Sequence, residues 1–261
     1  MTKGSYSSRL GAGLAMLEET RIFLDLWQPG MQAADLQRLA LESGRFPNVS
    51  ARRLRNLVGE CFALRYLAED GGPAALLKSL LPTLSNREYE QLLFLYTCRA
   101  HSILTDFVRE VYWTAYSAGR DVLTNEEARA WVTRANQDGK TTSPWSETSI
   151  KNVAGYLTGV CAEYGLLERG QRVSRKILSY RIESRVATVL AYDLHSKRHG
   201  DNAVLSHPDW ALFGMERDDV LDEMKRLALK GLLIVQSAGG VTRISWPHKT
   251  MEELADVLAH G

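Results

Sequence analysis

The chain has 261 residues, of which 45% are hydrophobic and 24% charged. This is the balance of an ordinary globular protein with one large domain or two to three small ones. The 32 Lys and Arg residues nearly cancel the 31 Asp and Glu residues, so overall charge indicates no class of partner, and only local clusters can. No apolar run reaches the roughly 20 residues that span a bilayer. We therefore expect a soluble, cytoplasmic protein with no membrane partner.

Helical periodicity dominates to about residue 165. Apolar stripes predict helices over about 14–26 and 32–43, with the Pro29-Gly30 pair between them. After a turn over 44–49, Ser50 is a suitable N-cap for a third helix. The apolar stripe of this third helix is Leu54, Leu57, Val58, Cys61 and Leu64. The order is that of a helix-turn-helix element.

Capping boxes mark two later helix starts. Ser85 with Glu88 opens a long apolar stretch that ends at Gly119 and predicts a core hairpin or one broken helix. Thr124 with Glu127 starts a further helix, and Ser146 caps the one after it. A Gly-Leu-Leu strand and a polar tip follow from residue 165. Two helices and then a strand with a tip are typical of a winged helix.

The pattern recurs at the C-terminal end. Helices are predicted over about 183–198, 208–213, 216–230 and 251–260, with a hairpin around Gly239-Gly240. We therefore predict a mainly α fold: a helical bundle core with helix-turn-helix and winged-helix modules and a small C-terminal β-hairpin wing. The predicted domains are 1–120, 121–182 and 183–261. Cys61, Cys98 and Cys161 are interpreted as buried free thiols.

No sequence motif indicates catalysis. The chain has no P-loop, dinucleotide-binding, nucleophile-elbow or HExxH motif, so we predict that it is not an enzyme and needs no cofactor. His195 and His199 share a helical face, as a metal pair would need. Because no third ligand stands at a suitable spacing, we interpret them as a solvated basic helix end and predict no metal site.

Two clusters of cations could bind nucleic acid, because each phosphate neutralised releases counterions. The first lies at the start of the third helix: Arg52, Arg53, Arg55 and Asn56. The N-terminal residues of the second helix of a helix-turn-helix meet base edges, for which Arg and Asn are suited. The alternative interpretation is a solvated face paired with acids such as Glu60.

The second cluster follows Gly165, in the wing of the middle module. It consists of Arg169, Arg172, Arg175, Lys176 and Arg181. The preceding helix exposes Lys151 and Asn152, and Lys140 stands at the turn before it. The alternative is a charged linker. The last module differs, because its second helix begins with Glu216, Asp218 and Asp219. These acids repel phosphate, so we expect that module to be structural or to bind protein.

Features spread over nearly the whole chain resemble the BrxA family of BREX phage-defence systems. They are Ser5-Tyr6-Ser7, the Asn48-Val49-Ser50 entry to the Arg-rich helix, the core from Tyr89 to Tyr112, Trp145 with Thr148 and Lys151 ahead of Tyr164-Gly165-Leu166-Leu167, and the Gly231-Leu232-Leu233 hairpin that ends at Trp246. The resemblance implies a non-catalytic accessory component that binds double-stranded DNA and works with other BREX proteins.

The helical part is also similar to antitermination factors of the NusB type, which bind RNA. The leading hypothesis is double-stranded DNA binding, mainly through phosphate contacts. An RNA-binding antitermination-like factor and a protein-interaction scaffold remain the alternatives.

Overall fold

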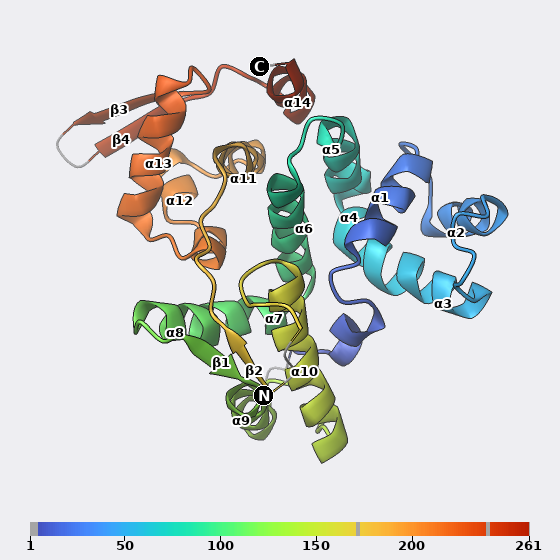
Figure 1. Ribbon diagram of the computed structural model, residues 1–261. Helices are drawn as coiled ribbons and strands as arrows, with labels where there is room; N and C mark the ends of the chain where they lie inside the picture. The colour runs from blue at the N-terminus through green and yellow to red at the C-terminus, as the bar shows by residue number, and fades with distance from the viewer. Residues whose placement is uncertain (1–4, 171–172, 239–240, 261) are drawn as a thin grey trace. The chain divides into compact units, whose positions relative to one another are not determined.

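The computed structural model describes residues 5–170, 173–238 and 241–260. These residues are predominantly helical, and they include two small antiparallel sheets (Figure 1). The predicted mainly α class and the C-terminal hairpin are confirmed. The chain forms two compact units, residues 1–75 with 93–180 and residues 76–92 with 181–261.

The first unit begins with the 3₁₀ helix η1 (Ser8–Ala12) and helices α1 (Leu17–Leu26) and α2 (Ala33–Glu42). Ser50 then caps α3 (Ala51–Asn56), as predicted: its side chain accepts a hydrogen bond from the Arg53 backbone N–H at 3.2 Å. A π-helical stretch, η2 (Leu57–Ala63), and α4 (Leu64–Tyr66) continue α3 without a break.

The π-helical stretch changes which side chains face the core. Leu54, Leu57, Val58 and Cys61 are buried as predicted. A π-helix inserts an extra residue per turn and so rotates the face of all that follows. As a result Leu64 is 37% exposed and Arg65 only 3%. The predicted place of Leu64 in the buried stripe is therefore wrong.

The rest of the first unit builds a helical core and a small sheet. Its elements are η3 (Glu69–Gly71), α5 (Gly72–Leu80), α6 (Asn86–Ala100), α7 (Ser102–Phe107), the π-helical η4 (Val108–Tyr112), α8 (Trp113–Ser117), β1 (Val122–Thr124), α9 (Asn125–Gln137), α10 (Glu147–Glu163) and β2 (Ser174–Lys176). Two of these helices are shared, because the end of α5 and the start of α6 belong to the second unit. The long apolar stretch is a broken helix, interrupted at His101. Strands β1 and β2 pair antiparallel, with Val122 opposite Lys176 (Figure 1).

The second unit carries the C-terminal hairpin. Its elements are α11 (Ser184–Ser196), α12 (Asp201–Leu205), the 3₁₀ helix η5 (Pro208–Phe213), α13 (Arg217–Leu229), β3 (Ile234–Ala238), β4 (Val241–Ser245) and α14 (Met251–His260). Trp210 anchors this core: it is 1% exposed and its indole N–H donates to the Val204 carbonyl at 2.8 Å. No described helix is long and apolar enough to cross a membrane.

The core of the first unit is rich in aromatic side chains. Phe62 makes edge-to-face contacts with Phe23 and Tyr66 at ring-centroid distances of 5.4 and 5.3 Å. Each fully buried ring contributes about 2 kcal/mol by leaving water. The three cysteines are free and buried, as predicted. Burial raises the pKa of the Cys161 thiol to about 12, so this thiol is protonated and inert at neutral pH.

Candidate nucleic-acid interface

Helix α10 is the element on which the candidate site is built. The Ser146 side chain caps it by accepting from the Ser149 backbone N–H at 3.2 Å, as predicted. Val153 and Leu157 are buried, whereas Lys151 and Asn152 are exposed. The helix therefore packs one face into the first unit and presents a cation and an amide on another.

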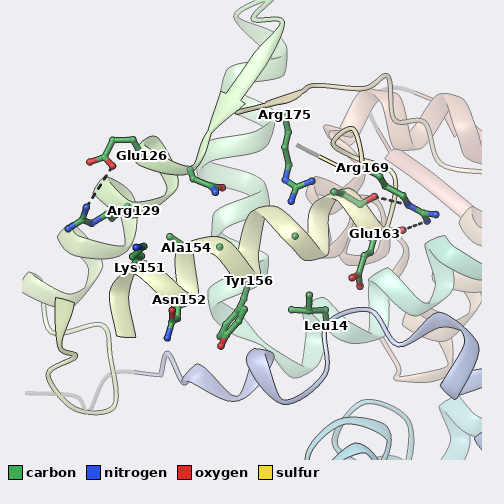
Figure 2. A pocket seen from close by; sticks show the side chains of 15 residues that line it. Leu14, Glu126, Arg129, Lys151, Asn152, Ala154, Tyr156, Glu163, Arg169 and Arg175 are labelled. Atoms are coloured by element: carbon green, nitrogen blue, oxygen red, sulfur yellow. Dashed lines mark hydrogen bonds and ion pairs between the residues drawn. The ribbon is translucent and has the colours of Figure 1, made fainter. Parts of the chain in front are cut away.

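A groove of about 780 Å³ runs along the outer face of α10 (Figure 2), and we call it the α10 trough. Its lining residues come from α10, from α9, from the segment between α10 and β2, from β2, and from the N-terminal segment. They are Lys151, Asn152, Ala154, Gly155, Tyr156, Gly159, Ala162 and Glu163 of α10, Asn125, Glu126 and Arg129 of α9, and Arg169, Gly170, Arg175 and Leu14. The floor is made of small residues, and the sides carry charge.

Four cations surround the trough, although they come from separate parts of the sequence. Arg129 forms an ion pair with Glu147 at 2.7 Å and a longer one with Glu126 at 3.9 Å. Lys151 is exposed and forms no ion pair with any described residue. Arg169 and Arg175 complete the set at the other end of α10 (Figure 2). We refer to these four side chains as the cationic rim.

The last two rim cations are positioned by backbone carbonyls. Arg169 donates from Nη2 to the Glu163 carbonyl at 2.8 Å, and therefore places its charge at the negative end of α10. Arg175 lies on β2 and donates from Nη1 to the Glu168 carbonyl at 3.1 Å. These contacts hold both guanidinium groups beside the trough.

The N-terminal segment forms the second wall of the trough. Gly11 packs against the Tyr156 ring so closely that a Cβ on Gly11 would lie 2.3 Å from Tyr156 Cε2. The Ala15 backbone N–H donates to Glu163 Oε2 at 2.7 Å. Further back, the Tyr6 backbone N–H donates to the Lys140 carbonyl at 2.9 Å. The segment is thus held against the C-terminal half of α10 and, at Tyr6, against the loop that precedes α10.

Two arginines of the α3–α4 helix also hold this segment. Arg53, which the sequence suggests as a DNA contact, donates to the Ala12 carbonyl. The buried Arg65 donates to the carbonyls of Gly13 and Ala15. Arg53 also lines a second depression of about 430 Å³, which shares Leu14, Glu163 and Arg169 with the trough. Arg53 therefore has a structural role in addition to its place near the trough.

The sequence-predicted site residues divide into two groups. The structure brings Lys151, Asn152, Arg169 and Arg175 together in the trough. The others lie outside its lining. Arg52, Arg55 and Asn56 are exposed on α3, Lys176 is exposed on β2, and Arg181 is exposed in the second unit. Lys140 forms a long ion pair, with its Nζ atom 3.9 Å from Glu110 Oε1. Arg172 falls outside the described residues.

Three lining residues of α9, Asn125, Glu126 and Arg129, were not predicted from the sequence as site residues. Asn125 Oδ1 accepts a hydrogen bond from Thr158 Oγ1 at 2.6 Å, which joins the first turn of α9 to α10. The available signal was the capping box at Thr124: it fixes the start of α9, and Asn125 and Arg129 then share a face at a spacing of four residues.

His195, in α11, and His199, just after it, differ from the interpretation as a solvated helix end. His195 stacks on Trp246 with ring centroids 4.4 Å apart and an interplanar angle of 12°. Burial lowers the pKa of His195, so this imidazole is neutral and part of the packing. His199 contacts His207 instead. Among residues 5–170, 173–238 and 241–260, no three His, Cys, Asp or Glu side chains are grouped to hold a metal ion.

The chain matches the model of a known protein family. The model of the BrxA family matches residues 4–193. The chain belongs to the BrxA family. Membership implies a component of a BREX phage-defence system, and the match includes the whole α10 trough. Residues 194–261, with α13 and the C-terminal hairpin, lie beyond it.

A solved structure has a similar fold to this BrxA-family chain. It is the crystal structure of an uncharacterized protein from Magnetospirillum magneticum, with a TM-score of 0.58 and 21% sequence identity. The similarity covers 73% of this chain and 94% of that one. At this identity the likeness concerns the fold alone. No curated protein matches the chain.

Proposed function

We propose that this chain is a non-catalytic, double-stranded DNA-binding component of a BREX system, and that the α10 trough is its nucleic-acid interface. The observation that carries the proposal is the cationic rim, because Arg129, Lys151, Arg169 and Arg175 lie around one groove in a chain of net charge +1. Local cation density is the electrostatic signature of phosphate binding.

The order of elements around α10 supports the same proposal. Helix α8, strand β1, helices α9 and α10, and strand β2 follow one another, and Leu167 forms an antiparallel bridge with Ile177. Strand β1 pairs with β2. This is the order in which a winged helix arranges its helices and its wing, with α10 in the place of the recognition helix.

Phosphate contacts are favoured over base reading. The exposed N-terminal part of α10 offers Lys151 and Asn152, but Glu147 precedes them and pairs with Arg129. Phosphate contacts fix position and carry no sequence information. The proposal is therefore a binding mode with strong salt dependence and little sequence preference.

A pair of matched double variants tests this proposal. Lys151→Glu with Asn152→Glu changes two exposed, consecutive residues in the trough, and Arg55→Glu with Asn56→Glu makes the same change of charge on α3. The affinity for a short DNA duplex is measured by fluorescence anisotropy over a range of salt concentrations. Each phosphate contact contributes about 0.9 to the slope of log affinity against log salt.

We expect the trough variant to bind at least about tenfold more weakly and its salt slope to fall by about 1. The α3 variant should bind like the wild type. If the α3 variant alone loses affinity, the interface lies on α3. If the wild type does not bind a duplex even at low salt, the proposal is wrong. A stronger affinity for single-stranded or hairpin RNA in direct competition would favour the antitermination-like alternative.

The second unit supports a scaffold role as a second candidate function. Helix α13 begins with exposed acids at Glu216, Asp218 and Asp219, and Leu229 near its end is 89% exposed. An acidic surface repels phosphate, whereas an exposed apolar side chain beside charge is typical of protein interfaces. Co-purification with other BREX proteins that survives the trough substitutions and is lost with Leu229→Asp would support this role.

A further inference from the structure

The C-terminal half of α10 is covered in a way that restricts what it can enter. The major groove of DNA is about 12 Å wide, and an α-helix with its side chains is about 10–12 Å across. From Tyr156 onward a second stretch of chain lies against α10: Gly11 contacts Tyr156, a Cβ on Gly159 would lie 3.6 Å from Leu14, and Glu163 binds the Ala15 N–H. Because an α-helix with its side chains already fills the major groove, a helix with a second stretch of chain packed against it is too wide to enter.

The floor of the trough is open immediately before this covered half, at Gly155. A Cβ built on Gly155 would meet no atom within 4 Å, so the space above this residue is open. Gly159 and Ala162 also line the trough, and Tyr156 and Leu14 lie beside α10 in the same view (Figure 2). The open space over Gly155 therefore lies next to an aromatic residue, Tyr156, and among the four cations of the rim.

This combination suits one strand of nucleic acid. Sites for single strands pair a positively charged groove, which follows the backbone, with apolar and aromatic surfaces on which bases stack. The trough volume of about 780 Å³ lies in the range of sites that enclose small organic ligands. A paired base within a duplex cannot reach this floor, because its faces are already stacked.

We infer that the α10 trough binds a locally unpaired strand of nucleic acid, with an unstacked base over Gly155 and the sugar-phosphate chain along the cationic rim. This inference rests on the proposed nucleic-acid function and refines it. Intact duplex contacts the rim only, whereas a duplex with a short single-stranded gap also occupies the floor. The protein should therefore bind the gapped duplex more tightly.

Two matched glycine substitutions test the inference. Gly155→Leu fills the floor and leaves every rim cation in place. The control, Gly59→Leu, makes the same change at an exposed helical glycine outside the trough lining, where an added Cβ also meets no atom within 4 Å. Both substitutions replace a helical glycine with a better helix former. Anisotropy titrations use three probes of one sequence: an intact duplex, the gapped duplex and the single strand.

The wild type and Gly59→Leu should prefer the gapped duplex to the intact one by roughly tenfold, since stacking of a base changes affinity by about that factor or more. Gly155→Leu should abolish this preference and retain its affinity for intact duplex, which also shows that it is folded. If Gly155→Leu binds intact duplex poorly, Gly155→Ala should reduce the preference in part.

The outcomes separate the two proposals. Equal affinity of the wild type for intact and gapped duplex overturns this inference and leaves the proposed function standing. A preference for the gap that survives in Gly155→Leu also overturns it, because the unpaired strand then binds elsewhere. Failure to bind any of the three probes contradicts the proposed function itself.

Discussion

Removal of one hydroxyl group should loosen the N-terminal wall of the trough. The Tyr6 side chain is 1% exposed, and its hydroxyl donates to Asp106 Oδ2 at 2.5 Å. Its ring stacks on Trp131 with centroids 5.9 Å apart. Tyr6→Phe keeps the ring and deletes the hydrogen bond to a carboxylate, which costs about 2 kcal/mol of the free energy of unfolding. The exposed Tyr116 provides the matched control, and Tyr116→Phe should change the free energy by less than about 0.5 kcal/mol.

The pH dependence of this loss tests its cause. Burial and then the Asp106 hydrogen bond raise the pKa of Tyr6 well above its usual value of 10.0. The unfolded chain therefore loses the Tyr6 proton above pH 10 while the native state keeps it. The stabilisation is complete below that pH and is lost as the pH rises, by about 1.4 kcal/mol per pH unit. Phenylalanine does not titrate, so the difference between wild type and Tyr6→Phe should narrow above pH 10.

Denaturant titrations followed by tryptophan fluorescence measure both effects, because Trp131 reports on its contact with Tyr6. A stability of Tyr6→Phe equal to that of the wild type at neutral pH would refute the reasoning. So would a difference that stays constant as the solution becomes more alkaline.

Three further predictions concern charge. The hydrogen bond from Arg120, and to a lesser extent those from the backbone and side chain of Thr124, lower the pKa of the Glu127 carboxyl to about 2. Glu127→Gln should therefore cost about 1 kcal/mol at neutral pH, after allowance for solvent screening, and the cost should vanish as the pH falls through about 2, as measured by thermal melting. Burial lowers the pKa of His101 to about 3 from 6.5, so acidification below 6.5 should destabilise the wild type. His101→Gln should make the free energy of unfolding, measured by denaturant titration, depend less on pH below 6.5. A pH dependence equal to that of the wild type would contradict this prediction. Glu163→Gln keeps an acceptor for the Ala15 N–H but removes an acid from the trough; duplex affinity should rise about twofold in anisotropy titrations, since one solvated charge contributes about 0.5 kcal/mol.

Features that depend on a few consecutive residues could be predicted from the sequence. The capping box of Thr124 and Glu127 forms as expected, with the Glu127 N–H bound to Thr124 Oγ1 at 3.2 Å and the Thr124 N–H bound to Glu127 Oε2 at 2.9 Å. Caps are local contacts that the helix start itself requires. For the same reason the helix periodicity predicted most elements of the fold.

The burial of Arg65 could not be predicted. The apolar stripe of α3 points to Leu64 as the next core residue, and only the π-helical stretch Leu57–Ala63 moves Arg65 into that position. Tertiary packing favours this shift of the helix face. It lets the Arg65 guanidinium donate hydrogen bonds to the carbonyls of Gly13 and Ala15, about fifty residues away in the sequence. No periodicity within one helix contains that information.

The candidate site was predicted in part for the same physical reason. Lys151, Arg169 and Arg175 could be selected as cations on a helix and its wing. Arg53 belongs to the same arginine cluster as Arg52 and Arg55, yet its guanidinium donates a hydrogen bond to the Ala12 carbonyl. Arg129 has no cationic neighbour in its own helix turn and becomes part of the rim only because α9 packs on α10.

Hydrogen–deuterium exchange with and without a DNA duplex tests the central claim most directly, because it locates the interface without any substitution. We expect duplex to slow amide exchange over residues 147–163 of α10 and over the segment from 165 to 176, with no change over α3 or α13. Protection confined to α3, or to the second unit, with α10 unchanged would contradict the account.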